Sequence, residues 1–252
     1  MFQNDVKKFY NYLKKKDELG HKIIFFTTSN RWEGEKELPK SSMLAKDLRD
    51  RLTNCEIIDV SKLKIWPCEG NVSRHGGNNC GIKEALLKDD KKNPHKFIRC
   101  WAAINNPKDE MYVVANKIYE SDIIVFFGSV RWGKMNSIYT ELIERLTWME
   151  NRHTSLGESN LLKDKEAGVV AMGHNWNGQN VVQLEKDVLK FFGFKTPKEL
   201  SFNRQWTSDA YYETISGYKK DYKDFLKEMN IVEKLKESLT DFNNWVMRKI
   251  NS

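Results

Sequence analysis

The chain of 252 residues lacks several features that would assign it to a special class of protein. Its longest apolar runs, Ile23 to Phe26 and Ile123 to Phe127, are far shorter than the roughly 20 residues that cross a bilayer. Its first residues contain no apolar segment typical of a secretory signal, and no block of five or six like charges occurs. We therefore expect a cytoplasmic protein that neither spans a membrane nor binds nucleic acid.

Cysteine is also scarce, because the chain holds only Cys55, Cys68, Cys80 and Cys100. No two of them have CxxC spacing, and without a secretory signal we expect reduced thiols. His75 lies between Cys68 and Cys80, which raises the question of a metal site. The alternative is a loop with ordinary thiols, and we predict no metal.

The composition is that of a globular protein with one full core. Apolar residues make up 40% of the chain and charged residues 31%, with 42 Lys and Arg against 35 Asp and Glu. The net charge of +7 permits an anionic ligand without demonstrating one. At roughly 150 residues per domain, this length favours one domain with additions.

Hydrophobic periodicity predicts strands that alternate with helices. The predicted strands cover 22–28, 55–60, 121–129, 167–175 and about 198–202, and the predicted helices cover 2–16, 41–52, 108–120, 137–152 and 180–194. We expect Ser41 or Ser42 to cap the second helix and Gly193 to end the last one. Such alternation indicates βαβ units and a parallel sheet covered by helices on both faces.

We predict a single domain over residues 1–252. Its core covers 22–202, the helix at 2–16 packs on this core, and a helical extension covers 204–252. Residues 61–107 are irregular, with one short helix expected at 81–88. An irregular segment of this length in a compact domain is usually functional.

Polar residues follow the first predicted strand, where a parallel sheet places its ligands. Ser29 and Arg31 come directly after that strand, and Ser41 and Ser42 begin the next helix. Hydroxyl groups, a guanidinium and a helix amino terminus together can bind a phosphate. Ordinary turn and capping chemistry is an equally good interpretation of these residues alone.

Glycines and an aromatic follow the third and fourth predicted strands as well. The third strand leads into residues 128–136, which include Arg131 and Trp132, and the fourth leads into residues 173–179, which include His174 and Trp176. Glycines let backbone N–H groups approach a ligand, and a tryptophan can cover a flat ring. The two loops suit a planar heteroaromatic ligand, although each Trp could also be a surface or core residue.

Three segments carry a resemblance to a known family: TTSNR…SS, SDIIVFFGSVRWGKMNSIYTELIERL and GVVAMGHNWNGQNV. Over about 22–202 the chain resembles the flavodoxin-like NAD(P)H-dependent FMN reductase and quinone reductase superfamily. There the segment after the third strand typically reads Ser-Pro-x-Tyr-Trp-Gly. Here Val130 and Arg131 stand in place of the family's Pro and Tyr, and the loop between Arg31 and Ser41 is longer than usual.

The resemblance implies a flavodoxin-like, doubly wound five-stranded parallel sheet of order 2-1-3-4-5. It also implies non-covalent FMN, reduced by NAD(P)H and reoxidised by a quinone-like or other small acceptor, in a homodimer. His174 would be a proton donor or a structural residue. The implied phosphate contacts are Ser29, Arg31, Ser41 and Ser42; the implied flavin-ring contacts are Ser129, Val130, Arg131, Trp132, Gly133, Met135, Gly173, His174, Asn177 and Gly178.

Three other functions compete with this one. The protein could be a flavodoxin-type electron carrier without its own substrate, or a flavin-free relative that serves as an interaction protein. Gly128-x4-Gly133-Lys134 has the spacing of a nucleotide-binding P-loop, but Met135 stands where Ser or Thr would hold Mg²⁺. Iron–sulfur flavoproteins of the superfamily carry a compact cysteine cluster before the third strand, whereas the cysteines here are widely spaced, so we expect no cluster.

Overall fold

The computed structural model describes residues 2–31, 37–173, 176–205 and 216–229. Five parallel strands form its sheet in the order β2-β1-β3-β5-β6, and β4 pairs with β3 alone in antiparallel fashion. The predicted five-stranded order 2-1-3-4-5 is therefore confirmed, with β4 as an additional short strand. The strands are β1 (Ile23–Thr27), β2 (Cys55–Asp59), β3 (Ile123–Arg131), β4 (Lys134–Met135), β5 (Glu166–Gly173) and β6 (Phe202–Gln205).

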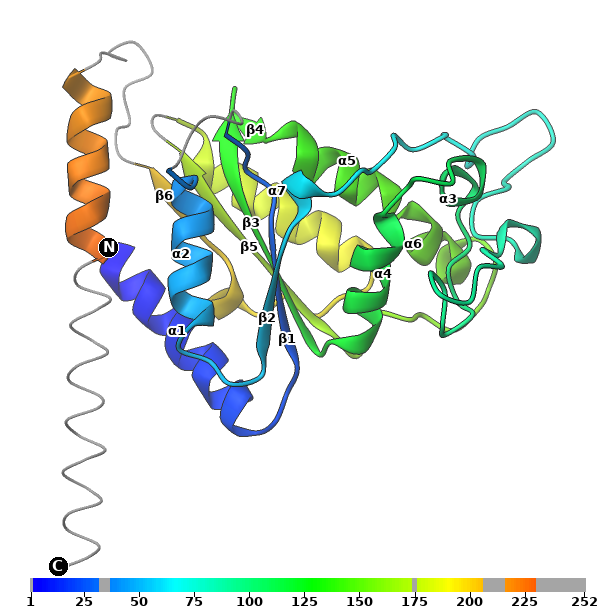
Figure 1. The fold of residues 1–252 in the computed structure, drawn as a ribbon, viewed down its shortest axis with the longest axis horizontal. Helices are drawn as coiled ribbons and strands as arrows, with labels where there is room; N and C mark the ends of the chain where they lie inside the picture. The colour runs from blue at the N-terminus through cyan, green and yellow to red at the C-terminus, as the bar shows by residue number, and fades with distance from the viewer. Residues whose placement is uncertain (1, 32–36, 174–175, 206–215, 230–252) are drawn as a thin grey trace, which may run out of the picture.

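Helices connect these strands and cover both faces of the sheet (Figure 1). The longer ones are α1 (Phe2–Glu18), α2 (Lys40–Arg49), α4 (Met111–Glu120), α5 (Ser137–Arg145), α6 (Thr147–Thr154) and α7 (Gly178–Phe191). The short ones are α3 (Trp101–Asn105) and the 3-10 turns η1 (Val60–Lys62), η2 (Lys83–Ala85) and η3 (Lys198–Leu200). A further helix covers residues 216–229.

Two buried clusters lie on opposite faces of the sheet, because successive strand residues point to opposite sides. Ile124 and Phe126 of β3 join the cluster under α4, α5 and α7, whereas Val125 and Phe127 join the cluster under α1 and α2. Figure 1 shows these helices on the two sides of the twisted sheet. The apolar runs of the strands are thus explained by burial on both faces.

The amino-terminal helix α1 completes one face of the sheet. Right-handed crossovers put α4, α5 and α7 on one face of the sheet. On the other face, the side of α2, they leave the apolar side chains of β3, β5 and β6 without a covering helix. Phe9 of α1 supplies this cover: its ring lies 6.1 Å from the ring of Phe127 and 5.4 Å from that of Phe202. The prediction that this helix packs on the core is confirmed. Phe225 of helix 216–229 joins the same cluster.

Four local predictions were wrong. The strand predicted at about 198–202 lies later, at β6 (Phe202–Gln205), and residues 198–200 form the turn η3. Neither Ser41 nor Ser42 is a helix cap, because Pro39 occupies the N-cap position and both serines are buried inside the first turn of α2. The predicted helix at 137–152 is divided at Leu146 into α5 and α6. The short helix expected at 81–88 is only the single 3-10 turn η2.

Gly193 ends the helix before it, as predicted. Its φ of 97° is a left-handed conformation that suits glycine. The Gly193 N–H bonds to the carbonyl of Lys190, and the Phe194 N–H bonds to that of Leu189.

A buried ion pair fixes the irregular segment of residues 61–107 to the core. Arg145 at the end of α5 donates to both carboxylate oxygens of Asp109, at 2.7 and 2.9 Å, and to the carbonyl of Trp66 at 2.5 Å. Both charged side chains are fully buried, so each needs the other. Burial lowers the pKa of Arg145, but the hydrogen bonds and charges of Asp109 and Cys100 together outweigh burial, so the net pKa is raised.

Of the helical extension predicted at 204–252, residues 204–205 belong to β6 instead, and the structure describes a helix at 216–229. Residues 206–215 and 230–252, which include most of the predicted tail helices as well as Trp206 and Tyr211, lie outside the described residues. Within the described part of the chain, no helix combines the length and the apolar character that a bilayer crossing requires.

Candidate functional site

The carboxyl ends of β1, β3 and β5 meet at one edge of the sheet. β1 and β3 are paired from Ile23 with Ile123 to Thr27 with Phe127, and β5 continues the same register on the far side of β3. The loops that follow these three strands therefore lie next to each other. This edge is where open parallel sheets bind ligands.

A small group of buried hydroxyls lies between the end of β1 and the start of α2. The Ser41 hydroxyl donates to the Ser29 hydroxyl at 2.9 Å. The Ser42 hydroxyl is also buried, but it has no hydrogen-bond partner among the described residues. A buried hydroxyl without a partner is costly, which is typical of a site that a ligand completes.

Positive charge gathers beside these hydroxyls. Burial, followed by the charges of Arg31 and Arg204, lowers the pKa of Lys40 to about 8, although Glu228 and Glu37 act in the opposite direction. The pKa shift of Lys40, the first residue of α2, shows that two arginines lie close enough to repel its charge. They are Arg31 in the loop after β1 and Arg204 in β6. An anion bound here would relieve their repulsion.

The helix at 216–229 closes over this charged region. Arg204 bonds to both carboxylate oxygens of Glu228, and the Tyr222 hydroxyl bonds to the carboxylate of Glu37, which precedes α2. The helix therefore holds both β6 and the segment before α2. The sequence leaves the role of the extension open among core completion, dimerisation and cover of the site.

The loop predicted after the third strand is a β-hairpin. β3 continues through Val130 and Arg131, which pair with Met135 and Lys134 of β4. Trp132 and Gly133 form the two-residue turn, with φ angles of 49° and 69°. The Trp132 side chain is 92% exposed. This geometry contradicts the P-loop alternative, since the segment turns back as a strand instead of wrapping a phosphate.

The loop after β5 is fastened to this hairpin. The Asn177 side-chain amide donates to the Gly133 carbonyl at 2.7 Å, while Asn177 itself adopts a left-handed φ of 66°. A methyl group at Gly133 would lie 2.9 Å from the ring of Trp176, and one at Gly173 would lie 3.0 Å from Val130. The second and third loops therefore form one continuous surface.

The structure brings the sequence-predicted residues together in two groups. Ser29, Ser41 and Ser42 meet near the cationic region. Gly173 and Asn177 lie against the hairpin, and the side chain of Met135 is buried. Gly178 lies against β6 instead, since its N–H bonds to the Gln205 side chain at 3.3 Å. The hairpin itself contains Ser129, Val130, Arg131, Trp132 and Gly133. His174 lies outside the described residues, so its role stays a prediction.

The predicted contacts do not include Lys40 or Arg204, and they do not include Thr28 or Asn136, although both of these lie in the predicted ligand loops. Lys40 directly precedes Ser41 and Ser42, and this position could have identified it as a candidate phosphate contact. Arg204 lies in β6, whose predicted position, about 198–202, was too early. Nothing in the spacing of Asn136 shows that its side chain reaches the β1 loop.

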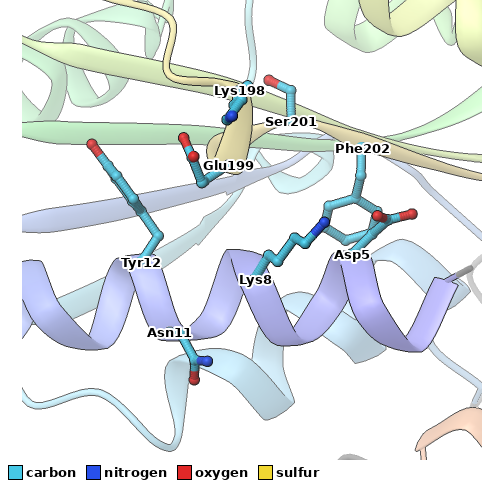
Figure 2. Close-up of a pocket in the computed structure, with 8 residues that line it drawn as sticks. All are labelled: Asp5, Lys8, Asn11, Tyr12, Lys198, Glu199, Ser201 and Phe202. Atoms are coloured by element: carbon cyan, nitrogen blue, oxygen red, sulfur yellow. The ribbon is translucent and has the colours of Figure 1, made fainter.

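The cavity drawn in Figure 2 is separate from this site. It has a volume of about 590 Å³ and lies between α1 and the segment that leads into β6. Charges of both signs line it, from Asp5 and Glu199 on one hand and Lys8 and Lys198 on the other. None of the predicted ligand residues belongs to it.

The cysteines do not form a metal centre in the described part of the chain, where no group of three or more His, Cys, Asp or Glu is placed to hold a metal ion. Burial, with smaller contributions from Cys100 and Cys68, raises the pKa of the Cys80 thiol to about 12. A thiol with such a pKa is protonated and unreactive at neutral pH.

No family model matches the chain, and no curated protein matches it. Among solved structures it is similar to RosB with bound 8-demethyl-8-formylriboflavin-5'-phosphate, at 17% identity and a TM-score of 0.53, over 84% of this chain and 75% of that one. It is also similar to the azoreductase AzrA, at 13% identity and a TM-score of 0.50, over 84% and 98% of the two chains. These likenesses establish a flavodoxin-like fold.

Proposed function

We propose that the protein is an FMN-binding oxidoreductase that passes electrons from NAD(P)H to a quinone-like or other small acceptor. One observation carries the proposal: three fastened loops form a single site with buried hydroxyls and cations at one end and an exposed tryptophan at the other. FMN has the same two parts, a phosphate and a flat ring. The fold shared with a flavin-phosphate-bound protein and an azoreductase supports this assignment.

The phosphate would be held by the serines and cations beyond β1. Ser29 and Ser41 present hydroxyls, and the Ser42 hydroxyl, which has no partner among the described residues, would gain an acceptor. Lys40 and Arg31 would supply charge. Bound at this place, the phosphate would also lie near the amino terminus of α2, whose free N–H groups favour an anion.

The flavin ring would lie along the β3–β4 hairpin. Gly133 and Gly173 let Trp176 and Val130 pack closely on the backbone, which joins the two loops, and Trp132 offers an aromatic face that is otherwise exposed to water. Arg131, which donates to the Ser129 hydroxyl at 3.4 Å, brings a positive charge to the hairpin. When bound, FMN supplies hydride acceptance and electron transfer, and the protein supplies orientation and electrostatics.

Further parts of the proposal concern His174, the cellular location and the oligomeric state. His174, next to Gly173, would donate a proton near the ring. The protein would work in the cytoplasm as a homodimer. A carrier function without a dedicated acceptor is the main alternative outcome of the test below.

The test is retention of flavin by the purified protein. The protein is incubated with FMN, desalted, and examined for the visible absorption bands of oxidised flavin. NADH and NADPH are then added in turn without oxygen, and loss of these bands distinguishes an enzyme from a carrier that needs a separate reductase. A colourless protein after desalting and by FMN titration would overturn the proposal.

A pair of variants links the result to the site. Replacing Ser41 and Ser42 together by Ala removes two buried hydroxyls, and we expect FMN to bind at least about tenfold more weakly. Ser155→Ala removes an exposed hydroxyl outside the three loops and should leave the affinity unchanged. Equal affinities for the two proteins would show that FMN binds elsewhere.

A further inference from the structure

The side chain of Asn136 joins two of the three loops. Its amide donates to the Thr28 carbonyl at 2.7 Å, and its oxygen accepts from the Thr28 hydroxyl at 3.0 Å and from the Ser129 N–H at 3.3 Å. Its own N–H bonds to the Ser129 carbonyl at 3.0 Å. Only 6% of Asn136 is exposed, so these contacts take place away from water.

The position of Asn136 in the chain makes this arrangement unusual. It directly precedes α5, where an asparagine normally accepts a hydrogen bond from the first turn of the helix. Here the side chain makes no such capping bond. Its carboxamide is directed to the loops after β1 and β3 instead, which leaves a helix end without its usual cap.

The packing around Asn136 leaves it little freedom. A methyl group at Gly128 would lie 2.8 Å from the Thr28 hydroxyl and 2.9 Å from the Asn136 side-chain oxygen. The backbone of β3 thus approaches the network as closely as its atoms permit. Any change in the network must move the loops that it joins.

We propose that Asn136 is a positioning residue that fixes the phosphate end of the site relative to its ring end. Thr28 precedes Ser29 of the hydroxyl group, and Ser129 precedes Val130 of the hairpin. Asn136 acts through these neighbours without touching the ligand. The inference rests on the proposed function, because the two ends need a fixed separation only if one ligand spans both.

The variant Asn136→Asp tests this through its pH dependence. A protonated carboxyl can still donate to the Thr28 carbonyl and accept from Ser129, but an ionised one cannot donate and repels that carbonyl. Burial will raise the carboxyl pKa above its ordinary value of about 3.9. The ratio of the variant's FMN dissociation constant to that of the wild type should therefore increase from pH 5 to pH 7.5, reaching about tenfold.

A second buried asparagine provides a matched control. Asn93 donates to the Leu87 carbonyl at 2.8 Å and accepts from the N–H groups of Phe97 and Ile98 at 2.9 and 3.1 Å. Asn93→Asp makes the same chemical change in the irregular segment, where it shares no partner with the three loops. It should lower the melting temperature of the apo protein, as Asn136→Asp does, without changing the ratio of FMN dissociation constants.

The outcomes separate the inference from the proposed function. If the wild type binds FMN and Asn136→Asp behaves as Asn93→Asp does at every pH, Asn136 is only structural and the inference is overturned. If the wild type binds no FMN, the proposed function fails and the inference fails with it. Should Asn136→Asp not fold, Thr28→Val removes one hydroxyl of the network, and an FMN affinity equal to the wild type would overturn the inference.

Discussion

At the residue scale, Lys40 provides a test of the proposed phosphate contact. Burial and two neighbouring arginines lower its pKa from 10.5 to about 8 in the free protein. The unfolded chain therefore holds this proton more tightly between these pH values. Consequently, the free protein gains stability as the pH rises from about 8 towards 10.5.

A bound phosphate should reverse this preference, because it favours the charged form of Lys40. We expect FMN affinity to fall as the pH rises through about 8, by about three- to tenfold at pH 9.5. FMN titrations at pH 7 and pH 9.5 measure the change. In Lys40→Gln the affinity should be lower at pH 7 and nearly constant over this range. A wild type with constant affinity would place the phosphate away from Lys40.

Gly128 is required for a steric reason. A methyl group there would meet the end of the Met135 side chain as well as Thr28 and Asn136. We expect Gly128→Ala to lower the free energy of unfolding by about 1–3 kcal/mol and to weaken FMN binding. Gly76→Ala is the matched control, since nothing lies within 4 Å of its added methyl group. Urea unfolding of both variants measures the difference, and equal stabilities would contradict the prediction.

The sequence predicted some residues of the candidate site and not others. Ser29 and Ser41 were found because each adjoins a strand or helix end, where a parallel sheet exposes its loops. Asn136 and Arg204 were missed because their partners, Thr28 and Glu228, are distant in sequence. Loop position follows from periodicity, whereas a side-chain hydrogen bond across loops depends on tertiary packing.

At the scale of elements, the β3–β4 hairpin has an unfavourable turn. Two-residue turns with positive φ at both positions strongly prefer Asn-Gly, yet Trp132 occupies the first position here. This is also why the sequence predicted an open loop: the usual hairpin signal is absent. A bulky residue kept in a left-handed conformation and exposed to water suggests a role in binding.

Trp132→Asn should therefore separate stability from function. We expect the variant to be more stable by about 0.5–1 kcal/mol, because asparagine tolerates this conformation. It should also bind FMN about fivefold more weakly, having lost an aromatic contact. Thermal unfolding of the apo protein and FMN titration measure the two effects. A less stable variant would contradict the strained turn, and a variant that binds FMN as the wild type does would show that Trp132 does not contact the flavin.

At the scale of the whole molecule, the fold depends on a helix from outside the β–α alternation. The spacing of Val6, Phe9 and Leu13 predicted that α1 packs on the core, and all three residues are buried there. The sequence did not show which face α1 covers. That follows from the handedness of the crossovers, which leaves β3, β5 and β6 open on the side of α2.

Phe9→Ala tests this dependence, since Phe9 is fully buried among Phe25, Phe127 and Phe202. We expect the free energy of unfolding to fall by about 3–5 kcal/mol, whereas Leu19→Ala, at an exposed position, should change it by less than about 0.5 kcal/mol. Urea unfolding measures both values. A small loss for Phe9→Ala would mean that α1 does not complete the core.

The same variant shows whether core and site are independent. A ligand that binds only the folded state adds about 2.7 kcal/mol at a concentration one hundred times its dissociation constant, whatever the stability of the free protein. Phe9 lies on the sheet face and not at the loop edge, so FMN should add equal increments to the wild type and to Phe9→Ala, and a smaller one to Asn136→Asp. A reduced increment in Phe9→Ala would show that α1 also holds the loops in place, because affinity would then depend on the packing of the sheet beneath them.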